Sequence, residues 1–133
     1  MSYTHTTADC HEHHDLVVNF GSEPKPKIIT LCGSTRFKDK INEVNANLTM
    51  CGNLVISLGV FGHTDMPAMD WETDGTSLKI GLDRLHRQKI DLADEVYVVN
   101  VGGYVGESTR REIEYATKLG KPVRYLEDIS DDD

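Results

Sequence analysis

The sequence lacks most features that mark secreted, membrane-bound or nucleic-acid-binding proteins. Its 133 residues include three cysteines, at positions 10, 32 and 51, and this odd, irregular set argues against a disulfide framework and favours a reducing compartment. No apolar run reaches membrane-spanning length, and the N-terminus lacks the apolar core of a signal peptide. The net charge is −8, whereas surfaces that bind nucleic-acid polymers are basic. These absences predict a cytoplasmic protein that contacts neither a membrane nor a nucleic-acid polymer.

The length allows one domain with a hydrophobic core, flanked by two polar ends. Residues 1–26 are polar and rich in histidine, which predicts a flexible N-terminal extension. This extension contains a run of potential metal ligands, but Asp15 stands where a zincin would place its second histidine, so adventitious metal affinity is the favoured interpretation. The run is Cys10, His11, Glu12, His13 and His14. Residues 27–127 form the predicted domain, and residues 128–133 form an acidic tail that is expected to be solvated.

Apolar segments alternate with helical patterns along the predicted domain. The segments that favour strands are 27–32, 54–58, 94–101 and 123–126, and the third reads as a strand buried on both faces. Helices are predicted from Ser34 or Thr35 to Gly52, over 77–93, and over 109–119. The alternation predicts an α/β fold with a parallel sheet and helices on both faces. The long segment 59–76 has no regular pattern, and loops of this length are usually functional or mobile.

The predicted helix over 77–93 carries a histidine on its apolar side. The apolar positions of this helix are Leu78, Leu82, Leu85, Ile90 and Ala93. His86 lies four residues from both Leu82 and Ile90, so its side chain is expected to point inward. A hydrogen-bonded core histidine and a functional histidine fit this position equally well.

Two glycine-containing loops follow the first and third predicted strands, and both are expected at the carboxyl edge of the sheet, where such folds bind ligands. The first loop comprises Gly33, Ser34, Thr35 and Arg36, and the second runs over residues 102–108 into a helix. Free N–H groups at that helix start, together with the Ser108 and Thr109 hydroxyls, suit a phosphate or a sugar hydroxyl. Arg36, Arg110 and Arg111 could add positive charge, and only one of the last two is expected to face the ligand.

Glu112 allows two interpretations. Thr109 and Glu112 have the spacing of a capping box, in which the carboxylate satisfies the N-terminal N–H groups of its own helix, and capping is the simpler interpretation. The functional interpretation aims the carboxylate at a sugar, where it would act as a nucleophile or stabilise an oxocarbenium-like transition state.

The order and spacing of several short motifs resemble those of the nucleoside 2-deoxyribosyltransferase superfamily, which includes 2′-deoxynucleoside 5′-phosphate N-hydrolases. The resemblance spans residues 28–126. The motifs are Cys32-Gly33-Ser34-Thr35-Arg36, His86 with Ile90, Ala93, Asp94 and Val96, Gly103-Tyr104-Val105-Gly106, Glu112-Ile113 with Ala116, and Gly120-Lys121-Pro122.

The resemblance implies a flavodoxin-like three-layer domain with a mostly parallel sheet of four to five strands, and a homodimer or larger assembly. It implies cleavage or exchange of an N-glycosidic bond, without a metal or organic cofactor. Glu112 matches the catalytic glutamate of the family, and His86 stands where the family has an aspartate and is expected to act as a general acid. The residues implied to contact the substrate are Gly33, Ser34, Thr35, Arg36, Gly103, Gly106, Ser108 and Thr109.

Two departures from the family pattern affect the expected substrate. An aromatic residue usual near the end of the first strand is absent, and Thr30 and Leu31 stand there. The loop over 106–112 is longer and more basic than in the transferases, which favours a phosphorylated ligand. The sequence therefore predicts an N-glycosidase for a nucleoside 5′-monophosphate. The alternatives are a nucleotide-binding sensor without catalysis, which the histidine at position 86 favours, and a deoxyribosyltransferase.

Overall fold

The computed structural model describes residues 25–68 and 77–129 and has an α/β fold built on a parallel sheet. The sheet has four strands in the order β2-β1-β3-β4. The strands are β1 (Ile28–Cys32), β2 (Leu54–Ile56), β3 (Glu95–Val98) and β4 (Val123–Tyr125). The predicted α/β class, the parallel sheet and the flavodoxin-like layering are confirmed. The expectations for residues 1–24, 69–76 and 130–133 lie outside the described residues.

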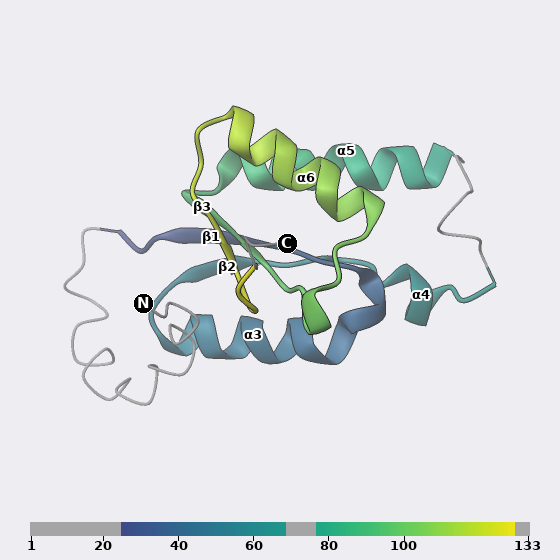
Figure 1. Ribbon diagram of the computed structural model, residues 1–133, viewed down its shortest axis with the longest axis horizontal. Coiled ribbons are helices and arrows are strands. Elements are labelled where there is room, and N and C mark those ends of the chain that lie inside the picture. The colour runs from purple at the N-terminus through teal and green to yellow at the C-terminus, as the bar shows by residue number, and fades with distance from the viewer. Residues whose placement is uncertain (1–24, 69–76, 130–133) are drawn as a thin grey trace.

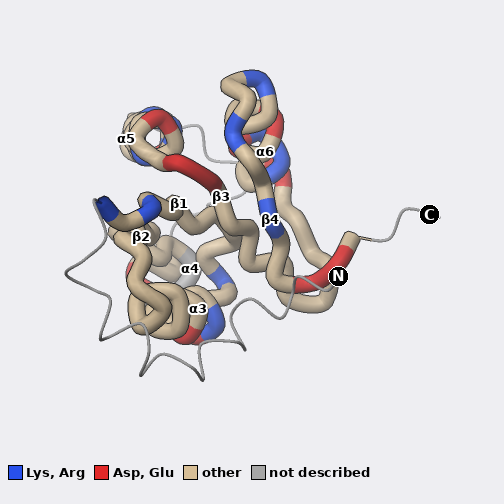
Figure 2. The backbone as a smooth tube through the Cα atoms, turned by 90° about the vertical axis from the view of Figure 1, so that its left-hand side faces the viewer, with Lys and Arg blue, Asp and Glu red and all other residues tan. Residues whose placement is uncertain are grey.

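Helices cover both faces of the sheet (Figure 1). Helix α3 (Lys38–Met50) packs on one face, and α5 (Ser77–Leu92) and α6 (Glu107–Lys118) lie next to each other on the other face, as Figure 2 also shows. Three short helices, η3 (Thr35–Phe37), α4 (Gly62–Asp65) and η4 (Val101–Gly103), lie in the connections. None of the helices in the described part of the chain has both the length and the apolar character needed to cross a membrane.

Alternate residues of the central strands build the two hydrophobic cores, because successive side chains of a strand point to opposite faces. The core under α3 contains Ile29, Leu31, Ile41, Val44, Leu48, Phe61, Tyr97 and Val99. The core under α5 and α6 contains Cys32, Ile90, Val96, Val98 and Ala116. Strand β3 is buried along its whole length, as its sequence predicts. Cys32, the last residue of β1, therefore faces α5 and α6, and this orientation matters for the site below.

Four predictions from sequence are wrong at the margins of the fold. The second strand ends at Ile56, two residues earlier than predicted, and it is partly exposed because β2 is an edge strand, with Leu54 52% exposed. Leu85 is exposed because it is rotated by about 100° from the buried His86 around the helix axis. Leu78 is exposed because the N-terminal end of α5 extends past the strands (Figure 1). Cys51 takes part in a disulfide, against the sequence expectation, whereas Cys32 is free.

The loop after β1 passes close to Val99, the residue after β3, so a side chain at position 33 would be crowded. A Cβ atom at Gly33 would lie 3.0 Å from the Val99 carbonyl oxygen and 3.3 Å from the Val99 Cβ. We expect Gly33→Ala to lower the free energy of unfolding by about 1–3 kcal/mol, because the backbone of a core strand must shift. Gly81→Ala is the matched control: nothing lies within 4 Å of its added Cβ, so this helix substitution should stabilise the protein by about 0.5–1 kcal/mol. Urea denaturation of both variants measures the difference, and equal stabilities would contradict the close approach.

Candidate active site

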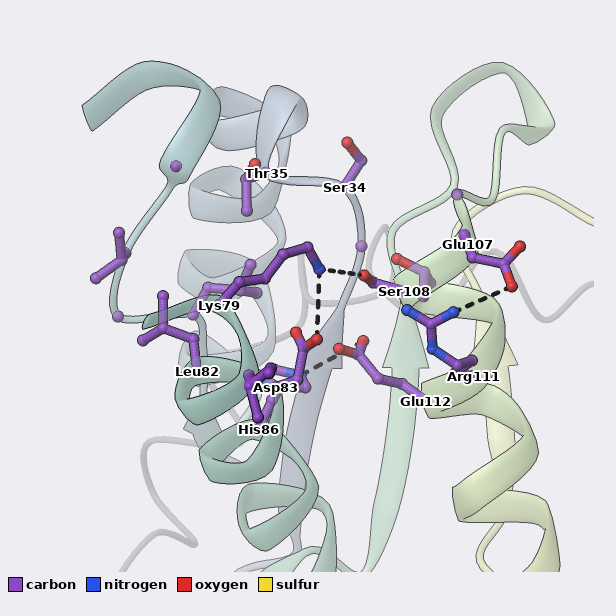
Figure 3. A pocket seen from close by; sticks show the side chains of 18 of the residues that line it. Ser34, Thr35, Lys79, Leu82, Asp83, His86, Glu107, Ser108, Arg111 and Glu112 are labelled. Atoms are coloured by element: carbon purple, nitrogen blue, oxygen red, sulfur yellow. Dashed lines mark hydrogen bonds and ion pairs between the residues drawn. The ribbon is translucent and has the colours of Figure 1, made fainter. Parts of the chain in front are cut away.

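A cavity of about 430 Å³ opens at the carboxyl edge of the sheet, between the loop after β1, the first half of α5 and the start of α6 (Figure 3). This is the edge at which the sequence predicts ligand binding, because both glycine-containing loops end there. Eight residues singled out from the sequence line it: Gly33, Ser34, Thr35, His86, Gly106, Ser108, Thr109 and Glu112.

Two other predicted contact residues do not line this cavity. The Arg36 guanidinium instead stacks on the ring of Tyr104, 4.9 Å from its centroid. Gly103 lies in η4, is exposed, and uses its backbone N–H to bond the Asn100 carbonyl at 2.8 Å. Its positive φ of 82° allows the chain to turn from β3 toward α6, so its role in the structure is conformational. Tyr104, which follows it, does line the cavity.

Helix α6 begins earlier than its sequence predicts, and this changes the interpretation of Glu112. The helix begins at Glu107, and its N-cap is Gly106, which provides no side-chain capping bond. Thr109 is therefore inside the helix and is 3% exposed, so the predicted capping box does not exist. Glu112 lies in the second turn, its side chain is 15% exposed, and it lines the cavity. The carboxylate is directed toward the cavity instead of its own helix terminus.

Glu112 meets two other reactive side chains at the bottom of the cavity. Its Oε1 lies 3.8 Å from His86 Nε2, and that nitrogen lies 3.5 Å from Cys32 Sγ. Within the described residues these three side chains are a group that could hold a metal ion, with all ligand atoms within 4.8 Å of one another. The three side chains come from α6, α5 and the end of β1, so the group depends on the packing of both helices on the sheet.

Burial favours the uncharged form of each of these three groups. It raises the pKa of Glu112 to about 7, so the carboxylate and the acid are both populated near neutral pH. Burial, reinforced by the nearby Lys89 charge, lowers the pKa of His86 to about 4. Burial also raises the pKa of the Cys32 thiol, and the charge of Glu112 adds to that increase. His86 is thus a neutral imidazole at neutral pH, which makes it a weak candidate for the general acid that the family resemblance implies.

Sequence reasoning missed two charged residues of the cavity, Lys79 and Asp83. Lys79 Nζ lies 3.3 Å from Asp83 Oδ2 and 3.2 Å from Ser108 Oγ, so it connects α5 to the first turn of α6 (Figure 3). The signal was present in the sequence, because Lys79, Asp83 and His86 follow the i, i+4, i+7 spacing of one helix face. The leucines of this helix instead predicted its inward side, although Leu78 and Leu85 are exposed in the structure.

Arg111 lines the cavity and Arg110 does not, in agreement with the expectation that only one of them faces it. Both contact Glu107, at 2.7 Å for Arg110 Nη2 and 3.1 Å for Arg111 Nη1. The two guanidinium groups offset the negative charge of Glu107 at the helix start. The N-terminus of α6 therefore keeps its attraction for an anion despite an acidic residue in its first turn.

Comparisons with protein-family models, with curated proteins and with solved structures give no match. The resemblance to the nucleoside 2-deoxyribosyltransferases therefore stays a prediction that rests on the order of short motifs. The residues that line the cavity are therefore the basis for the function proposed below.

Proposed function

We propose that the protein is an N-glycosidase that cleaves the base–sugar bond of a nucleoside 5′-monophosphate. The observation that supports this most directly is the position of Glu112. It places a partly ionised carboxylate in the same cavity as a helix N-terminus, an ammonium group and a hydroxyl. A carboxylate suits a sugar carbon that gains positive charge, and the helix N-terminus suits a phosphate.

In the proposed reaction a Glu112 carboxylate oxygen attacks the anomeric carbon while the carbon–nitrogen bond breaks. The bonding electron pair goes to the base nitrogen, which takes up a proton as the base leaves. Water then attacks the anomeric carbon of the glycosyl-enzyme, returns Glu112 as a carboxylate and releases the sugar phosphate. The proton for the base comes from water in the open cavity, because His86 is a neutral imidazole and the Asp83 carboxylate accepts a hydrogen bond from Lys79. His86 is proposed to position the Glu112 carboxyl, 3.8 Å from its Nε2.

The phosphate is proposed to bind at the first turn of α6. Ser108 provides a hydroxyl there, and Lys79 provides a charge 3.2 Å from that hydroxyl. Arg111, which also lines the cavity, adds a second cation. Hydrogen bonds that involve charged groups contribute about 1.5–3 kcal/mol each, so this set can distinguish a nucleotide from a nucleoside.

Incubation with a panel of ribo- and deoxyribonucleoside 5′-monophosphates, followed by chromatography of the released base, tests the proposal. We expect one or more of them to yield free base and sugar phosphate, and the matching nucleosides to react more slowly. Addition of a second free base separates hydrolysis from transfer, because a transferase would form the exchanged nucleotide. If no substrate of the panel releases base, the proposal is wrong.

A nucleotide sensor is the second candidate, and the buried environment of Glu112 favours it. The carboxyl is packed against a thiol and an imidazole, and its raised pKa leaves part of it protonated at neutral pH. A sensor would be stabilised against heat by a nucleoside monophosphate without releasing base. Thermal unfolding with and without nucleotide, run beside the base-release assay, distinguishes the two functions.

We further propose that the protein is a homodimer that pairs through α5. Leu78, Leu85 and Leu92 recur every seven residues and are 42%, 55% and 66% exposed, which makes one apolar stripe on the outer side of the helix. Leu85→Glu is expected to shift the protein to a monomer in analytical ultracentrifugation, because it places a charge in the middle of that stripe. Leu119→Glu is the control, since Leu119 is 46% exposed but lies after α6. A wild-type monomer, or dissociation by both changes, would contradict pairing through α5.

A further inference from the structure

The Cys32, His86 and Glu112 group has the dimensions of a metal-binding site. A tetrahedral zinc ion with one sulfur, one nitrogen and one oxygen ligand sets ligand–ligand distances of about 3.3–3.6 Å. Cys32 Sγ and His86 Nε2 are 3.5 Å apart, within this range. His86 Nε2 and Glu112 Oε1 are 3.8 Å apart, a few tenths of an ångström beyond it, and all three ligand atoms lie within 4.8 Å of one another.

The chemistry of the three groups also fits. Thiolate, imidazole and carboxylate are the ligands that zinc prefers, and three protein ligands with one open position is the pattern of exchangeable zinc sites. Nε2 is the nitrogen of His86 that is directed at Cys32 and Glu112.

We propose that Cys32, His86 and Glu112 bind Zn²⁺ or a similar divalent transition metal, with the fourth coordination position open to the cavity. Cys32 is fully buried, whereas His86 and Glu112 line the cavity, so the open position faces the space where the nucleotide is proposed to bind. The ion would use the carboxylate that the glycosidase reaction needs as its nucleophile. Metal binding and base release are therefore mutually exclusive, and the ion acts as an inhibitor. The proposed inhibition rests on the proposed function, whereas the proposed metal binding does not.

Titration with Co²⁺ tests the binding. In a site with a thiolate ligand, Co²⁺ gives a sulfur-to-metal charge-transfer band, which a purely histidine-bound ion does not give. The experiment uses the full chain with His11, His13 and His14 changed to alanine, so that the N-terminal histidines do not compete. We expect one equivalent of Co²⁺ to produce the charge-transfer band and one equivalent of Zn²⁺ to remove it.

Two cysteine variants locate the site. Cys32→Ser should abolish the charge-transfer band, and the control in which Cys10 and Cys51 are both changed to serine should keep it, because Cys32 then remains as the one thiol. Glu112→Gln, which retains the thiol, should weaken Co²⁺ binding by at least about 10-fold, since even ligand-supporting groups cost 10–100-fold in affinity. Circular dichroism checks that each variant is folded. If Cys32→Ser is not folded, the Co²⁺ affinity of Glu112→Gln becomes the test of the site. A wild-type protein without the band, a band that survives in folded Cys32→Ser, or unchanged affinity in Glu112→Gln would overturn the site.

Inhibition is measured separately from binding. One equivalent of Zn²⁺ should reduce base release by at least about 10-fold, and a chelator should restore it. If no nucleotide releases base at all, the proposed function fails, and the Co²⁺ titration alone decides on the metal site. If base release is found and the zinc-loaded protein is fully active, the proposal that Zn²⁺ binding prevents base release is wrong.

Discussion

Glu112→Gln is expected to lower the rate of base release by at least about 10³-fold, because loss of the nucleophile of a covalent mechanism costs factors of this size or more. An amide has the same shape as the carboxyl and can still contact Cys32 and His86, so the cavity should keep its form. Nucleotide affinity is accordingly expected to stay within about 10-fold of that of the wild type. Base release is followed by chromatography, and affinity by calorimetry with a nucleoside monophosphate.

Glu114→Gln is the matched control for this substitution. Glu114 lies on the same helix, is exposed, and does not line the main cavity. It should retain wild-type turnover. Equal activity in the two variants would remove Glu112 from the reaction. A loss of nucleotide binding that parallels the loss of turnover would assign Glu112 to binding and not to chemistry.

The fold could be predicted from sequence because local patterns and tertiary packing agree in most of the chain. Residues 96–99 contain no charged side chain to mark an exposed face, and all four are buried. Helix α3 buries Ile41, Val44 and Leu48, whose spacing is that of one helix face. Errors occur where the environment decides: β2 lies at the sheet edge, and the N-terminal end of α5 extends past the sheet, so their apolar residues are exposed.

The site was harder to predict, and the start of α6 shows why. Thr109 and Glu112 match a capping box by spacing, but the helix begins two residues earlier, at Glu107, with Gly106 as its N-cap. Spacing alone does not fix the first residue of a helix, and a shift of this size turns a capping carboxylate into one that faces a cavity. The low pKa of His86 was equally hidden, because it depends on burial between α5 and the sheet.

Lys79→Met is expected to remove most of the preference for a nucleotide over its nucleoside. The ammonium group is 3.2 Å from Ser108 Oγ at the N-terminus of α6, and a charged hydrogen bond to phosphate contributes about 1.5–3 kcal/mol. The ratio of kcat/KM between nucleoside 5′-monophosphate and nucleoside should therefore fall by about 10- to 100-fold, mainly through KM. The methionine keeps the length of the side chain, and loss of the partly buried pair with Asp83 should cost at most about 1 kcal/mol of stability.

Lys40→Met is the control, because Lys40 belongs to α3 on the opposite face of the sheet and pairs with Glu43 at 3.1 Å. It removes the same charge from the protein but not from the cavity, so the kcat/KM ratio should stay that of the wild type. An equal loss in both variants would mean that long-range charge, and not a bond at the helix start, draws the nucleotide in. An unchanged ratio in Lys79→Met would place the phosphate elsewhere, and Arg111 would then be the cation of the cavity to test next.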